Sequence, residues 1–107
     1  MSVITKIKYH TRKAKEFHRD AKDYAEGARR HADDWSPLSR IYKNLSKLSR
    51  EAGIAHNNAA KWHSKWARGE AQPYNAKVAR MDARNAGDRL NYRKRRDARA
   101  ITFAKYY

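Results

Sequence analysis

The N-terminal third of the chain carries apolar, alanine and histidine side chains at steps of three and four residues. The stripe consists of Ile7, His10, Ala14, Phe17, Ala21, Tyr24, Ala28, His31 and Trp35. This period is typical of one face of an α-helix and predicts a long helix over residues 5–34. Such a stripe requires a helical partner. We expect it to pack within its own chain, with a homo-oligomer through this helix as the alternative, and we expect His10 and His31 to fill the seam rather than bind a ligand.

A second apolar stripe follows Ser36 and Pro37, two residues that favour the start of a helix. It consists of Leu38, Ile41, Leu45, Leu48 and Ala52. Gly53 comes next and predicts the left-handed end of that helix, with Ile54 folding back onto it. The stripe therefore indicates a core helix that ends at Gly53.

The residues around Gly53 have a recognisable spacing. Leu48 and Ser49 lie five and four residues before the glycine, and Ile54, Ala59 and Trp62 lie one, six and nine residues after it. Over residues 45–64 this spacing resembles the repressor-type helix-turn-helix family. The resemblance implies a tight turn at Gly53, within a hairpin over residues 37–69 that presents its second helix to DNA. The chain departs from the family where Ser49 replaces the usual alanine and Ala59 a larger aliphatic residue. Any capped helical hairpin would also carry Gly-Ile here.

The second helix of that hairpin supplies candidate contacts to nucleic acid. If Ala59, Trp62 and Trp66 are buried, helical spacing leaves Asn57, Lys61, Ser64, Lys65 and Arg68 facing outward, with His56 at the helix start. Asparagine suits bidentate pairing with adenine, lysine and arginine neutralise phosphates, and serine bonds to either. The alternative is that Asn57 caps the helix and the lysines are merely solvated.

Residues 73–107 form a basic C-terminal helix or tail. Tyr74, Val78 and Met81 form one apolar line, and Ala76, Ala79, Ala83, Ala86 and Leu90 form another, which predicts contacts with two neighbours before Gly87 weakens the helix. The basic run beyond it fits binding along a phosphate backbone, through Arg89, Arg93, Lys94, Arg95, Arg96 and Arg99. The alternative is a solvated helical or frayed tail.

Composition supports a helical protein. The 107 residues suffice for a single domain, and eighteen alanines and twelve aromatic residues favour helices that approach closely around large rings. The sequence predicts an all-α fold, a small bundle of about four helices. The chain has no cysteine and no apolar run long enough for a membrane span or a secretion signal. We expect an intracellular, cytoplasmic protein without membrane contact, or one associated with a virion.

The net charge of +15 indicates an acidic partner. Nucleic acid is the leading candidate, with DNA favoured over RNA, and the helix-turn-helix resemblance adds a regulatory role. The alternatives are an inhibitor or adaptor that docks on an acidic protein, of the kind frequent in phages, and a structural component of a nucleoprotein particle or virion. No nucleophile or phosphate loop accompanies His31, Asp33 and Asp34, so we expect no enzyme and no cofactor. His56 and His63 are too far apart for a chelating pair, so we expect no metal.

Overall fold

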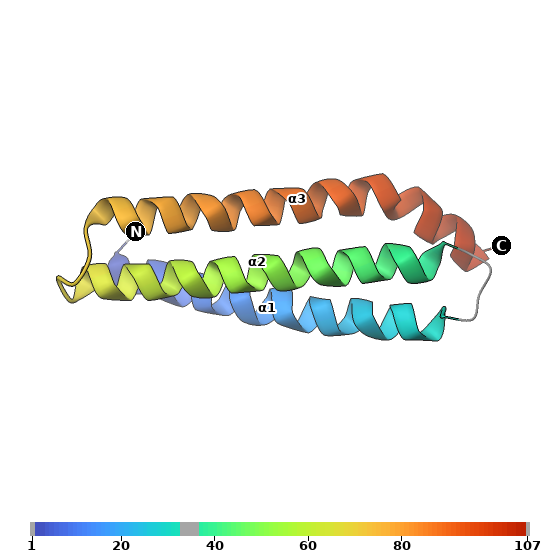
Figure 1. The fold of residues 1–107 in the computed structure, drawn as a ribbon, viewed down its shortest axis with the longest axis horizontal. Helices are drawn as coiled ribbons and strands as arrows, with labels where there is room; N and C mark the ends of the chain where they lie inside the picture. The colour runs from blue at the N-terminus through green and yellow to red at the C-terminus, as the bar shows by residue number, and fades with distance from the viewer. Residues whose placement is uncertain (1, 33–36, 107) are drawn as a thin grey trace.

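The computed structural model describes residues 2–32 and 37–106 and contains three long helices. They are α1 (Val3–Arg30), α2 (Leu38–Ala67) and α3 (Pro73–Tyr106), and successive helices run antiparallel in a rod of 55 × 20 × 17 Å (Figure 1). No strand occurs in the described ranges, so the predicted all-α class is confirmed. The predicted number of about four helices is wrong, because there are three.

The first helix starts and stops close to its predicted bounds. It begins at Val3 rather than residue 5 because the Ser2 hydroxyl accepts a hydrogen bond from the Thr5 amide at 3.1 Å and caps the helix. It ends at Arg30, with His31 as C-cap. The expected end at residue 34 and the expected cap at Ser36 lie outside the described residues.

The turn predicted at Gly53 is wrong, because α2 runs unbroken from Leu38 to Ala67. Gly53 is buried within the helix, where a Cβ atom would lie 2.9 Å from ring atoms of His18 on α1. The glycine thus lets a side chain of α1 pass closely instead of ending α2. The turn occurs at Gly69, whose φ of 73° is the left-handed conformation that glycine favours. The end of α2 at Ala67 lies close to residue 69, where the predicted hairpin ends.

The seam between α1 and α2 is a ladder of rings flanked by alanines, and we call it the ring interface. His10 stacks on His63 with centroids 5.3 Å apart, Phe17 on His56 at 5.4 Å, and His31 on Tyr42 at 5.8 Å. Ala14, Ala21 and Ala28 are buried beside them. The predicted packing within the chain is therefore confirmed, and α2 covers the face that a homo-oligomer would have used.

Small residues of α2 bring the two backbones together. The Ser46 hydroxyl donates to the carbonyl oxygen of Ala21 at 2.7 Å, and the Ser39 hydroxyl donates to that of Ala28 at 3.2 Å. Gly53 continues the same seven-residue spacing. Hydrogen bonds to main-chain carbonyls require close approach, so these small residues set the separation of α1 and α2.

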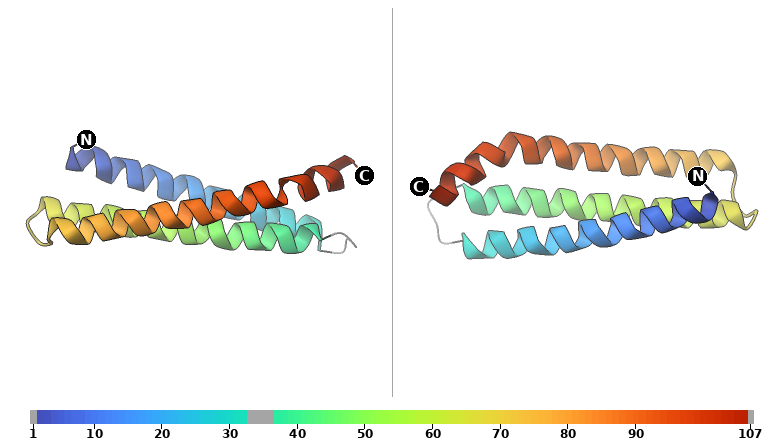
Figure 2. Two further views of the ribbon diagram at one scale, coloured as in Figure 1. Left: turned by 90° about the horizontal axis from the view of Figure 1, so that it is seen from above. Right: turned by 180° about the vertical axis from the view of Figure 1, so that it is seen from behind.

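The third helix packs on α2 through alanines, and we call this contact the alanine interface. Its core joins Ala79 and Ala83 of α3 to Ala59 of α2, with Trp62 packed alongside. Among the described residues, Cα atoms within 8 Å link α1 to α2 and α2 to α3, but do not link α1 to α3. In Figure 2, α2 accordingly runs alongside each outer helix.

The second apolar line of α3 has no helix packed on it in the described part of the chain. The alanine line packs on α2, whereas Tyr74, Val78 and Met81 are exposed to solvent. Helix α3 continues through Gly87 to Tyr106 without a break. No helix within the described ranges has both the length and the apolar character required to cross a bilayer.

Candidate nucleic-acid interface

The outward face of α2 carries a long row of cations, which we call the α2 ridge. It consists of Arg40, Lys43, Lys47, Arg50, Lys61, Lys65 and Arg68. These residues recur at steps of three and four apart from one gap, so they share one side of the helix. All are exposed except Lys65, which is half-buried. From the first cation to the last the ridge spans about 42 Å at ~1.5 Å per residue.

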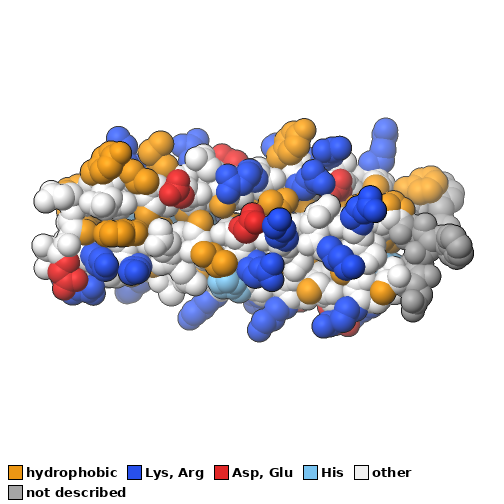
Figure 3. Space-filling view, in the orientation of Figure 1, with side chains coloured by type: hydrophobic (Ala, Val, Ile, Leu, Met, Phe, Trp, Pro, Cys, Tyr) orange, Lys and Arg blue, Asp and Glu red, His pale blue; other side chains and the backbone are white. Residues whose placement is uncertain are grey.

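Most of this charge is not neutralised within the described part of the protein. Arg68 pairs with Glu70 at 3.1 Å, and the Lys65 ammonium lies 4.8 Å from the centroid of the Trp62 ring. The other five cations form no ion pair with a described acidic residue, and α2 contains a single acid, Glu51. Figure 3 shows Lys and Arg side chains along the whole length of one face, with few acidic ones among them.

The first helix differs because its acids neutralise part of its charge. The Glu16 carboxylate has one oxygen 3.9 Å from Nε of Arg12 and the other 3.4 Å from Nζ of Lys13. Glu26 pairs with Arg29 and Arg30. These pairs are exposed, so each contributes at most about 1 kcal/mol to stability. Their main effect is to lower the net potential of α1 relative to that of the α2 ridge.

Part of α1 nevertheless extends the basic surface beside the ridge. The Asn57 amide nitrogen lies 3.4 Å from Nε2 of His18, which places this face of α1 next to the outward face of α2. Lys15 and Lys22 are three and four residues from His18, on the same side of the helix, and both are exposed. The ridge therefore has a second, shorter row of cations along one flank.

The predicted site residues on α2 fall into two groups. Asn57, Lys61 and Arg68 are exposed, and Ser64 and Lys65 are half-buried. His56 is a correction, because only 7 % of it is exposed and its Nδ1 lies 2.8 Å from Nδ1 of His10. Because α2 continues through Gly53, His56 lies on the same face of the helix as His63, seven residues away, and is part of the ring interface.

The predicted basic run on α3 does not form one surface. Arg89, Arg95, Arg96 and Arg99 are exposed, whereas Arg93 and Lys94 are half-buried. Nε of Arg93 lies 3.7 Å from Oδ2 of Asp97, and the Lys94 ammonium lies 5.9 Å from the centroid of the Tyr24 ring on α1. Consecutive helical residues point about 100° apart, so this run is distributed around α3.

The first half of the ridge was missed by sequence analysis. Arg40, Lys43, Lys47 and Arg50 alternate with the apolar stripe of the same helix, and that spacing was the available signal. A turn at Gly53 would have separated them from Lys61 and the residues that follow. Only a continuous α2 aligns both halves on one side.

Three histidines of the ring interface, His10, His56 and His63, have lowered pKa values. Burial, and the nearby His56, His63 and Arg80, lower the pKa of His10 from 6.5 to about 4. Burial is also the main cause of the lowered pKa values of His56 and His63. The Nδ1 atoms of His10 and His56 share a hydrogen bond, so in the neutral pair one ring has its proton on Nδ1 and the other on Nε2. The described residues contain no group of three potential ligands placed to hold a metal ion.

Comparison with protein-family models, with curated proteins and with solved structures finds no match to this chain. The functional conclusion therefore rests on the charge and the geometry of the molecule itself.

Proposed function

We propose that this protein binds nucleic acid without catalysing a reaction, by laying the α2 ridge along the phosphates of duplex DNA. The observation that carries the proposal is the length of a ridge whose charge is mostly unpaired. A ridge of about 42 Å matches the axial length of about 12 base pairs at ~3.4 Å per phosphate on each strand. Release of the counterions condensed on those phosphates would drive binding.

The proposed binding mode reads little sequence. Lysine and arginine contacts to phosphate fix position without identifying bases. Asn57 is the exposed ridge-side residue best suited to a base edge, but its amide already faces His18. A straight helix that carries mostly cations is therefore proposed as a backbone binder, in a packaging or protecting role rather than that of a sequence-reading regulator.

A second candidate is supported by the exposed apolar line on α3. Tyr74 is 72 % exposed, Met81 51 % and Val78 38 %. Apolar and aromatic side chains flanked by arginines are typical of protein contacts. An adaptor that docks on an acidic protein would use this line, and its binding would survive removal of cations from the ridge.

The test is the salt dependence of binding to a 24-base-pair duplex, measured by fluorescence anisotropy. Contact with ~6–10 phosphates predicts an affinity that falls ~10³–10⁵-fold between 50 and 200 mM salt. A variant with Arg40→Ala, Lys43→Ala, Lys47→Ala and Arg50→Ala should lower the slope of log affinity against log salt by about 3–4, at ~0.9 per phosphate contact.

The matched control removes the same charge from α3, with Arg89→Ala, Arg95→Ala, Arg96→Ala and Arg99→Ala. These side chains are exposed and spread around the helix. We expect their loss to lower the slope by about 1 or less. Equal losses in the two variants, or no binding at 50 mM salt, would rule out the ridge as the interface.

A further inference from the structure

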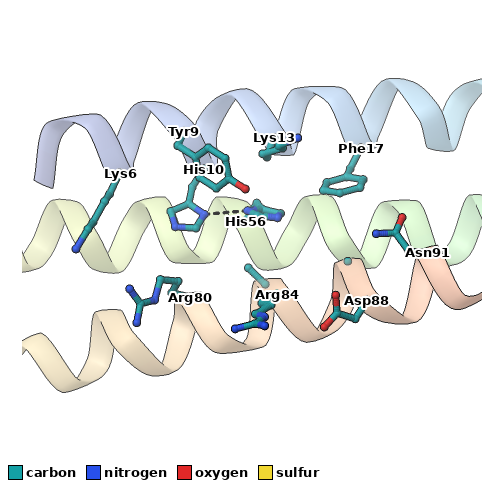
Figure 4. Close-up of a pocket in the computed structure, with 12 residues that line it drawn as sticks. Lys6, Tyr9, His10, Lys13, Phe17, His56, Arg80, Arg84, Asp88 and Asn91 are labelled. Carbon is teal, nitrogen blue, oxygen red and sulfur yellow. Dashed lines mark hydrogen bonds between the residues drawn. The ribbon is translucent and has the colours of Figure 1, made fainter. Parts of the chain in front are cut away.

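A groove runs between α1 and α3 with α2 as its floor. Because the backbones of the outer helices stay apart, with no Cα pair within 8 Å among the described residues, side chains of all three helices line a cavity of about 530 Å³. A second hollow of about 350 Å³ continues it toward Pro73, and the two share Lys6 and Arg80 in their linings. Figure 4 shows the larger part, with Lys6 on α1 and Arg80 on α3 on opposite sides.

The walls of the groove are strongly basic. Lys6 of α1 faces Lys77, Arg80 and Arg84 of α3 across it, and Lys13, which pairs with Glu16, lies further along α1. Asp88 is the one acid among the lining residues. Arg80 and Arg84 form no ion pair with a described acid, although both are exposed and their side chains are long enough to reach one. A groove with this excess of charge attracts an anion.

The floor contains a polar side chain that lacks a partner. His63 lines the second hollow and is 2 % exposed, and neither of its ring nitrogens has a hydrogen-bond partner. A buried polar group left without a hydrogen bond costs about 1–3 kcal/mol. Burial lowers the pKa of His63, and the charges of Lys6 and Arg80 lower it further, so both cations act on this side chain. A ligand oxygen between Lys6 and Arg80 would meet both cations above the buried imidazole.

Aromatic rings border the same cations. Tyr9 lines the larger part of the groove, and Trp66 and Tyr74 line the smaller part. The Lys6 ammonium lies 5.9 Å from the centroid of the Trp66 ring, so charge and ring are within reach of one nucleotide. Tyr9 and Tyr74 are 38 % and 72 % exposed, which leaves ring surface for stacking. Cations that track a backbone beside rings that stack on bases are the features of single-strand binding sites.

We propose that this groove binds a single-stranded segment of nucleic acid, with its phosphates on Lys6, Arg80 and Arg84 and its bases against the neighbouring rings. From Pro73 to Asn91 the α3 wall spans about 27 Å at ~1.5 Å per residue. This length accommodates about four nucleotides, the low end of the ~4–16 that single-strand binding folds cover. A duplex keeps its bases stacked inside, where Tyr9 and Tyr74 cannot stack on them, so the exposed rings favour a single strand.

This inference extends the proposed preference for nucleic acid to a surface separate from the α2 ridge. The experiment measures the affinity of a fluorescein-labelled eight-nucleotide thymidine strand and of the 24-base-pair duplex for two variants of the full chain. Arg80→Ala with Arg84→Ala removes two charges from the groove. Lys43→Ala with Lys47→Ala removes two from the ridge. All four side chains are exposed, and circular dichroism checks that each variant keeps its fold.

We expect the groove variant to weaken single-strand binding at least tenfold and duplex binding less than threefold. The ridge variant should show the reverse pattern. Tyr9→Leu keeps the charge but removes a ring, and should weaken single-strand binding about tenfold while leaving the duplex unaffected. The first two results support the groove, and the third supports base stacking within it.

Equal weakening of single-strand binding by the two charge variants would overturn the proposal, because net charge alone would then account for the binding. Polyglutamate that displaces the labelled strand as well as unlabelled thymidine strand of equal charge would also overturn it, in favour of an acidic peptide. A chain that binds the duplex but not the strand refutes the groove and retains the α2 ridge. A chain that binds the strand but not the duplex refutes the ridge and retains the groove.

Discussion

The two interfaces of α2 differ in how they hold their partners. The ring interface with α1 stacks imidazole, phenyl and phenol rings and adds two serine hydrogen bonds to main-chain carbonyls. The alanine interface with α3 centres on methyl groups, with Trp62 as its largest side chain. Each buried methyl contributes about 0.8 kcal/mol, whereas a fully buried ring contributes several times more.

Helix α2 is thus joined to α1 and to α3 by two different kinds of contact. The ring interface holds α1 through the buried area of its rings and through stacking and hydrogen bonds, which require a particular orientation. The alanine interface holds α3 by close approach alone and leaves its outer apolar line uncovered. Helix α3 is therefore the element that should separate first, and the groove between α1 and α3 depends on its position.

The largest expected effect comes from placing a charge in each interface. Ala21→Glu should lower the free energy of unfolding by more than about 3 kcal/mol and disrupt the whole fold, because an unpaired carboxylate replaces a methyl beneath the Ser46 hydrogen bond. Ala83→Glu should instead release α3 and leave the hairpin of α1 and α2 helical. Circular dichroism and limited proteolysis distinguish global unfolding from local release.

Asn85→Glu is the matched control for Ala83→Glu, since it adds the same charge to an exposed position of the same helix. It should change the free energy of unfolding by less than about 0.5 kcal/mol. If Ala83→Glu also abolished the helicity of α1 and α2, the alanine interface would be as essential as the ring interface, and the contrast between them would disappear.

Acid should weaken the ring interface more than the alanine interface. Burial lowers the pKa of His10 to about 4, below its unfolded value near 6.5, so its contribution is complete above pH 6.5. Below that pH His10 is protonated in the unfolded chain but not in the folded protein. Its contribution to the free energy of unfolding is therefore lost progressively toward pH 4. At pH 5, His10 alone should remove about 2 kcal/mol, at ~1.4 kcal/mol per pKa unit.

Urea unfolding at pH 7.5 and pH 5.0 measures this loss. His56 and His63 should add to it, because their pKa values are lowered as well. The alanine cluster itself contains no titratable side chain, but Arg80 of α3 helps to lower the pKa values of His10 and His63, so their protonation should also weaken the packing of α3, to a smaller extent. His10→Phe should reduce the difference between the two pH values. Equal urea midpoints in the unmodified protein would show that the pKa values of His10, His56 and His63 are not lowered.

The smallest expected effect contrasts two glycines. Gly87→Ala should stabilise the protein by about 0.5–1 kcal/mol, because alanine is the better helix former and a Cβ at this position meets nothing within 4 Å. Gly53→Ala should bring no such gain, since its Cβ would press on the His18 ring at 2.9 Å. Thermal melts of the two variants decide the matter, and an equal gain in both would mean that the ring interface tolerates bulk where α1 passes.

The sequence by itself determined what depends on local periodicity. The heptad stripe of α1, with alanine at one position and rings at the other, required a helical partner and found it in α2. The alanine line of α3 likewise identified the face that is buried. The end of α2 near Gly69 follows from the conformational freedom of that glycine. These features are encoded within a few turns of helix, so no distant contact was needed to predict them.

Only the tertiary structure decided the role of Gly53. A glycine after an apolar stripe fits a helix end as well as it fits a close crossing, and the choice depends on whether another helix passes there. His18, thirty-five residues earlier in the chain, passes at that point. The continuous helix that results buries His56 in the seam and joins the two halves of the α2 ridge.

The groove likewise could not be predicted from the sequence. Its lining extends from Lys6 to Asn91 and draws on all three helices, so no local pattern brings these residues together. The exposure of Tyr74 and Met81 was also decided in three dimensions, because in the described structure the backbone of α3 packs on α2 alone, whereas its two apolar lines predicted two such contacts. A helical period shows which residues share a face, but whether a partner covers that face depends on contacts between segments far apart in the chain.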